Sequence, residues 1–172
     1  MTPQEILSQK DVKPKEKTEM ISRMLSEKKF SAGEWLELAS AAKDPVKATL
    51  IEAMEFSTKE VPALLDEPGF DFLVRSLSAK APRVKWESAK TIGNTAQRFP
   101  HKLDEAVEAL KKNAADEGTV VRWSAAFALG EIVKLNLPLN KQLVPLVKKI
   151  MEKEEKNSIR KIYAAALKKA AG

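Results

Sequence analysis

The sequence predicts an all-α protein, a superhelix (solenoid) of about four stacked helical hairpins preceded by a capping pair of helices. One helical template recurs along the chain at intervals of 37 or 38 residues, and no stretch shows the alternation of a β-strand. With 172 residues, 44% of them hydrophobic, the chain is long enough to bury one continuous core. A solenoid is expected because a hairpin of this size buries too little apolar surface alone.

The template is clearest between Thr119 and Leu135, in the segment TVVRWSAAFALGEIVKL. Drawn as a helix with about 100° between successive residues, it has two distinct faces. The apolar face, typical of a helix packed on a core, consists of Val121, Ala125, Ala128, Leu129 and Ile132. The opposite face carries Trp123, Phe127, Gly130 and Lys134. Large aromatics on this second face need their own partner, either a neighbouring repeat or a ligand.

Four segments share the template and set the domain organisation. Each begins with an apolar anchor, and the anchors are Val46, Val84, Val121 and Ile159. A basic residue follows each anchor, namely Lys47, Lys85, Arg122 and Arg160. The copies divide a single domain, 1–172, into N-terminal capping helices at 1–30 and repeats at 31–57, 58–99, 100–136 and 137–172.

Capping signals mark several helix starts. Thr2 with Glu5, and Ser31 with Glu34, have the spacing of capping boxes. The expected N-caps of three template helices are Asp44, Thr119 and Asn157. Pro145 is expected to bend its helix without abolishing it.

Composition and motifs argue against an enzyme and against a metal or cofactor site. The chain has no cysteine and one histidine, His101, which is expected to be a surface or capping residue. It has no glycine-rich phosphate loop, no HExxH motif and no serine in a nucleophile elbow. Without a long apolar run or a signal-peptide pattern at its start, the sequence favours a cytoplasmic protein.

The net charge of +6 is concentrated near one end of the chain. Residues 1–120 hold 19 basic and 20 acidic side chains, whereas residues 121–172 hold 11 and 4, so the two parts carry −1 and +7. The basicity therefore belongs to the last two predicted repeats.

The residue types at corresponding positions of the four template segments resemble those of the HEAT repeat family. The resemblance rests on VVRWSAAFALG and on VPALL and LVPLV in the preceding helices, and it covers roughly residues 31–172. It implies that the second helix of each hairpin lines a concave surface. It also implies that the basic residue after each anchor joins a ladder of side chains between repeats, although the acid expected just before each anchor is present only as Asp44.

A groove lined by the second helices would present the residues opposite the core stripe. The candidate ligand-binding residues are Trp86, Lys90, Trp123, Phe127, Lys134, Lys161 and Lys168. Glu52 and Glu55 occupy the corresponding positions in the first repeat, so the expected surface changes from acidic to aromatic to basic. Two alternatives remain open: the aromatics fill gaps between helices, and the lysines form an ordinary solvated face.

The leading functional hypothesis is a non-enzymatic scaffold that binds a protein or peptide through aromatic anchors and steering lysines. The alternative is a nucleic-acid-binding protein, because bacterial DNA alkylation repair glycosylases also resemble stacked HEAT-like helices. Those enzymes need a carboxylate near the aromatics, and one turn after the two tryptophans this chain has Lys90 and Phe127. Phycobilin lyases also use HEAT-like repeats, but only the shared repeat plan links this sequence to them. The sequence predicts no particular oligomeric state.

Overall fold

The computed structural model describes all residues, 1–172, as ten α-helices and three short 3-10 helices, with no strand. The α-helices are α1 Pro3–Ser8, α2 Pro14–Ser26, α3 Ala32–Ala41, α4 Asp44–Glu60, α5 Glu67–Ser76, α6 Pro82–Thr95, α7 Leu103–Asn113, α8 Thr119–Val133, α9 Asn140–Lys153 and α10 Asn157–Ala171. The 3-10 helices are η1 Pro62–Leu64, η2 Ala96–Arg98 and η3 Pro100–Lys102. None of these helices is long and apolar enough to span a membrane.

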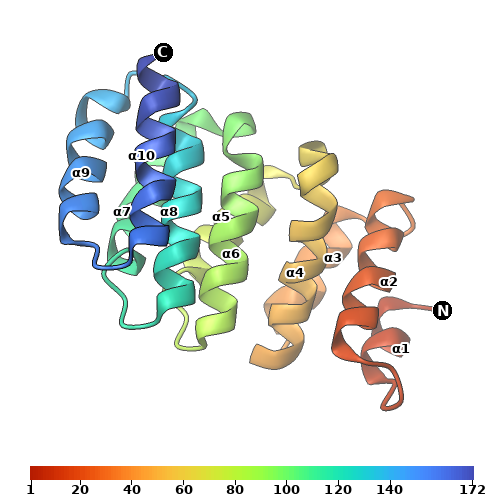
Figure 1. Cartoon of the computed structure of the whole chain (residues 1–172). Helices are drawn as coiled ribbons and strands as arrows, with labels where there is room; N and C mark the ends of the chain where they lie inside the picture. Colours follow the sequence, from red (N-terminus) through yellow and green to blue (C-terminus); the bar gives the residue numbers. More distant parts are fainter.

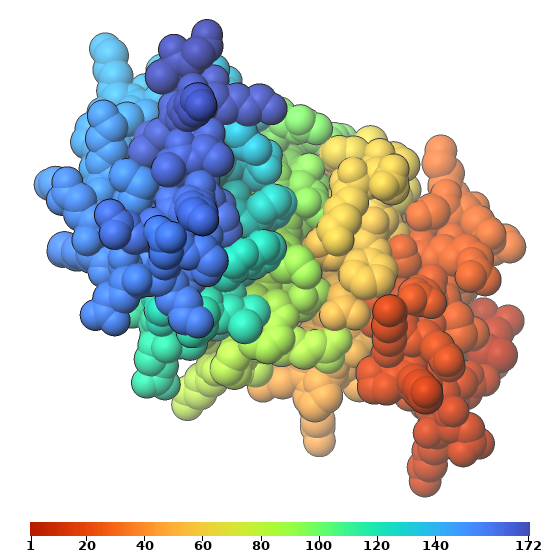
Figure 2. All heavy atoms as spheres, in the orientation of Figure 1, coloured from red at the N-terminus to blue at the C-terminus, as the bar shows by residue number.

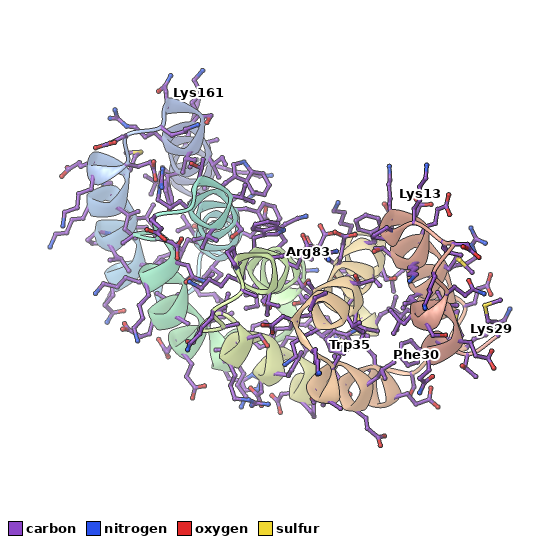
Figure 3. The ribbon with its side chains drawn as sticks, turned by 90° about the horizontal axis from the view of Figure 1, so that it is seen from below. Lys13, Lys29, Phe30, Trp35, Arg83 and Lys161 are labelled. Atoms are coloured by element: carbon purple, nitrogen blue, oxygen red, sulfur yellow. The ribbon has the colours of Figure 1, made fainter.

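The helices form consecutive hairpins that stack into a curved solenoid (Figure 1). The second helices, α2, α4, α6, α8 and α10, lie side by side and make the inner, concave layer, while α3, α5, α7 and α9 make the outer layer (Figure 3). The inner layer runs in chain order from one end of the molecule to the other (Figure 2). The predicted all-α superhelix is thereby confirmed.

The core follows the template stripe with one exception. Val121, Ala125, Ala128, Leu129 and Ile132 are all buried, as predicted. The anchors Val84 and Ile159 are buried as well, but the first anchor, Val46, is exposed. In the same repeat the indole of Trp35, on α3, is fully buried, and its N–H donates to the Leu50 carbonyl oxygen at 2.8 Å.

Both predicted capping boxes are present. The Thr2 and Ser31 hydroxyls accept from the backbone N–H groups of Glu5 and Glu34, each at 3.1 Å. The three other predicted N-caps are wrong by one position, because the residues that precede them, Lys43, Gly118 and Lys156, occupy the cap. None of these three caps through its side chain, and before α8 and α10 an upstream carboxylate accepts a backbone N–H instead.

The repeat boundaries predicted at 30/31, 99/100 and 136/137 fall outside the α-helices. The boundary predicted at 57/58 falls inside α4, which continues to Glu60. Pro145 lies within α9, and the helix continues through it to Lys153, as expected.

Candidate ligand-binding groove on the inner face

Ion pairs between successive repeats form a short ladder at the start of the inner helices. Lys85 of α6 contacts Asp116 at 2.9 Å, and Arg122 of α8 contacts Glu154 at 3.1 Å. Each acid lies in the loop before the next inner helix, five residues ahead of that helix's anchor. The ladder expected from the HEAT resemblance therefore exists between these repeats. Its acids lie further ahead of the anchors than the HEAT pattern predicts.

The acids of the ladder also organise the loop backbone. Asp116 accepts from the Gly118 N–H at 2.8 Å, and Glu154 accepts from the Lys156 N–H at 3.0 Å. The Gly118 hydrogen bond, with Lys85 beside it, holds the pKa of the Asp116 carboxyl below its ordinary value. Lys85 and Arg122 are therefore occupied by internal contacts.

The two outer members of the basic column have different surroundings. Lys47 lies over the Phe72 ring, 5.9 Å from its centroid. Arg160, on the last helix, is exposed.

The part of the inner face built from α4 and α6 is neutralised internally. Glu52 pairs with Arg83 at 3.4 Å, at the junction of the two helices (Figure 3), and Glu55 pairs with Lys59 at 3.1 Å. Lys90 lies between two carboxylates, 3.3 Å from Glu87 and 3.7 Å from Glu55. The acidic start predicted for the groove is wrong, because its carboxylates are paired with cations of the same two helices.

Glu55 and Glu87 are almost completely buried, since α4 lies between α2 and α6, and α6 lies between α4 and α8. Each retains one carboxylate oxygen without a hydrogen-bond partner. Burial raises the pKa of the Glu87 carboxyl above its ordinary value, Lys90 opposes the shift, and Glu52 and Glu55 add to it. Burying these charges costs folding free energy. The candidate ligand-binding residue Lys90 is therefore committed to the two buried carboxylates.

The aromatic residues of the middle repeats divide between packing and exposure. Phe127 of α8 packs over Gly93 of α6, so closely that a Cβ atom built on Gly93 would lie 2.6 Å from the ring. Trp123 stacks in parallel on Phe127, with 6.0 Å between ring centroids, and remains 39% exposed. Trp86 is half-buried on α6. Of the three predicted anchors, Trp123 offers the most open surface to a ligand.

A groove of about 300 Å³ lies between α8 and α10, beside the aromatic pair. It is lined by Phe127, Gly130, Glu131, Lys134, Ile162, Ala165, Ala166 and Lys169. Small residues make its floor, and Lys134 pairs with Glu131 at the rim at 2.8 Å. The groove therefore joins an apolar floor to a charged edge.

The predicted lysines of α10 lie at different places around that groove. Lys161 and Lys168 are exposed but do not line the groove. Lys161 lies on α10, the last inner helix, at the end of the stack (Figure 3). The lysine of α10 that does line the groove is Lys169, which was not among the residues predicted from the sequence. Lys169 follows Glu131 by 38 residues, one repeat length, so the template column of Glu131 could have identified it.

A second hollow, of about 620 Å³, lies between α7 and α9. Its wall includes Asp116, Arg122 and Glu154, the residues of the ion-pair ladder. Because these charges already satisfy one another, we regard the hollow as part of the scaffold.

No protein-family model matches the sequence, and no curated protein matches it significantly. Solved structures do match. An engineered protein has a TM-score of 0.78 at 19% identity, covering 98% of this chain and 79% of that one. A designed armadillo repeat protein in complex with the peptide (KR)4 has a TM-score of 0.71 at 21% identity, covering 89% and 69%.

A natural protein is among the matches. The complex of CpcE and CpcF, the phycocyanin lyase from Nostoc sp. PCC7120, contains a chain with a TM-score of 0.71 at 19% identity, covering 95% of this chain and 96% of that one. The chain has an armadillo/HEAT-like α-solenoid fold. At these identities the comparisons establish the fold, while function must be argued from the groove.

Proposed function

We propose that this α-solenoid is a non-enzymatic scaffold that binds a protein or peptide partner on its inner face. The observation that carries the proposal is the Trp123–Phe127 stack, which holds a large, partly exposed aromatic surface rigidly beside an open groove. Rigid aromatic anchors beside a pocket are the usual centres of binding energy in protein interfaces. Trp123 is the principal anchor, because Phe127 is largely committed to packing on Gly93.

The structural relatives support the same use of the fold. One designed armadillo repeat protein was solved with a bound peptide, and the phycocyanin lyase chain was solved in a protein complex. Unlike a (KR)4 ligand, the partner of this chain is expected to be acidic, because its inner face is neutral over α4 and α6 and basic toward α10.

Selection from a phage library of random dodecapeptides tests the proposal. The wild-type chain should enrich specific peptides, and Trp123→Ala should lose them while keeping its helical circular dichroism. Val61→Ala, which removes another exposed apolar side chain at the end of α4, is the matched control and should retain them. Failure of the folded wild-type chain to enrich any peptide would count against a peptide-binding role.

Nucleic-acid binding is the second candidate, and one observation favours it. Nine basic side chains lie between residues 141 and 172 against three acidic ones, and none of the nine forms an ion pair. Binding driven by these residues should weaken steeply with salt, with a log–log slope of about −0.7 to −0.9 for each neutralised phosphate. Titration of labelled single- and double-stranded DNA at several salt concentrations measures that slope.

A further inference from the structure

The four template helices, α4, α6, α8 and α10, have three junctions, and we call the equivalent place at each junction a slot. Each slot is filled differently. One residue comes from the earlier helix, at Glu55, Gly93 or Gly130, and these positions are spaced by 38 and 37 residues. The facing residue comes from the next helix, at Lys90, Phe127 or Ala165, spaced by 37 and 38 residues. The repeat thus brings the same two positions to each junction, and at the third Gly130 and Ala165 both line the groove.

The first two slots are closed by the protein's own side chains. In the first, Lys90 reaches across to Glu55 at 3.7 Å. In the second, the Phe127 ring covers Gly93 so closely that only a glycine fits beneath it. A glycine in one helix and a phenylalanine in the next therefore form a complementary pair.

The third slot has the glycine but lacks the ring. Gly130 lies against α10, where a Cβ atom would meet the Ala166 Cβ at 3.2 Å, much as one at Gly93 would meet the Ala128 Cα at 3.3 Å. The residue equivalent to Phe127 is Ala165, which is exposed. The groove of about 300 Å³ between α8 and α10 is the space that this missing side chain leaves.

The rim of the third slot sets the charge of an occupant. Lys134 and Lys169 stand at its edge, and Lys161 and Lys168 are exposed on the same helix as Lys169. Glu131 neutralises Lys134, but no acidic side chain pairs with any of the three lysines of α10. Lys168 and Lys169 also lie in the last turn of α10, where positive charge stabilises the helix dipole. That alternative role explains the lysines but not the apolar groove beside them.

The floor of the slot favours a protein segment over a nucleic acid. Glycine and alanine offer no flat π-surface on which a base could stack, and the Phe127 ring beside them is half-buried and packed on Gly93.

We propose that the α8–α10 slot binds a phenylalanine-sized apolar side chain of an acidic protein segment, which takes the place that Phe127 takes one repeat earlier. The partner's carboxylates pair with Lys169 and the neighbouring lysines of α10. This inference rests on the proposed peptide-binding role and specifies the anchor and the charge of the partner.

The variant Ala165→Phe tests the inference, because it supplies the missing ring from within the chain. It should fill the slot over Gly130 and leave the melting temperature equal to or above that of the wild type. It should weaken binding of the most enriched library peptide about tenfold or more, and a peptide with its central apolar residue changed to alanine should lose a similar factor. The matched control is Ala164→Phe, which adds the same ring at the adjacent exposed alanine, outside the groove, and should bind the peptide as the wild type does.

The outcomes separate the slot from the general function. Enriched peptides that combine a large apolar residue with flanking Asp or Glu, and that Ala165→Phe no longer binds, support the inference. Peptides that need Trp123 but bind Ala165→Phe at full affinity would contradict binding in the α8–α10 slot, while remaining consistent with the scaffold role. Enrichment of peptides without acidic residues, or retention of labelled single-stranded DNA in place of any peptide, would overturn the proposed partner. No enrichment at all would contradict the scaffold role itself.

Discussion

Between α4 and α6 the inner face is closed by buried charges, whereas between α8 and α10 an equivalent slot is open and apolar. The same helical positions hold Glu55 and Lys90 in the first case and Gly130 and Ala165 in the second. The difference teaches that the repeat fixes where a slot lies, while the side chains at two positions decide whether it is used for stability or left for a ligand.

Two lysines with the same spacing to their acids should differ strongly in their contribution to stability. Lys90 and Lys134 each pair with a glutamate three residues earlier, but Glu87 is buried and Glu131 is not. Lys90→Ala should lower the free energy of unfolding by about 3 kcal/mol, because it leaves buried carboxylates without their shared cation. Lys134→Ala should cost about 0.5 kcal/mol or less. Urea unfolding of both variants measures the difference, and equal losses would contradict the contrast between the two slots.

Two glycines should tolerate alanine to different degrees. Gly93→Ala should destabilise by about 1–2 kcal/mol, because the new methyl overlaps the Phe127 ring and outweighs the gain in helix propensity. Gly130→Ala should be close to neutral, since its nearest neighbour, at 3.2 Å, is the Ala166 methyl. Thermal unfolding measures both. Adding Phe127→Ala should remove most of the specific cost of Gly93→Ala, and additive losses would argue against the packed pair.

Trp123 should matter more for binding than for folding. Trp123→Ala should lower the free energy of unfolding by about 0.5–1 kcal/mol, the contribution of one partly exposed aromatic stack. In a Trp86→Phe background, the remaining indoles are the buried Trp35 and the exposed Trp123, so iodide quenching reports chiefly on Trp123. Peptide binding should protect it from quenching, and unchanged quenching at saturation would remove Trp123 from the binding surface.

The smallest expected effect is a pH dependence at the closed slot. Burial raises the pKa of Glu87 above its ordinary value of 4.5, so the folded state holds this proton to higher pH than the unfolded state. Stability should therefore fall as pH rises from about 4.5 through the raised pKa. Glu87→Gln should lessen that fall, whereas the exposed Glu108→Gln should not. Urea midpoints measured across this range for the three proteins test the sign, and identical profiles would exclude Glu87 as the source.

Much of the fold could be predicted because a helical repeat is encoded locally. The period, the core stripe from Val121 to Ile132 and the capping boxes at Thr2 and Ser31 all depend on residues close in sequence. The exposure of Val46 was not predictable in this way, because burial depends on how neighbouring helices pack, as the buried Trp35 indole of α3 packs on Leu50 of α4. The acids of the ladder were also missed, since their loop positions acquire meaning only when two repeats are stacked.

The sequence by itself determined the stacked helical hairpins, the positions on the inner helices and the excess of positive charge near the C-terminus. Only the tertiary structure decided which of those positions a ligand can reach. Lys90 and Phe127 share one template column with Ala165, yet the first lies against buried acids, the second lies on a glycine and the third leaves a groove. The physical reason is that exposure and pairing belong to the contact between two helices, and the periodicity of one helix does not specify the side chains opposite it.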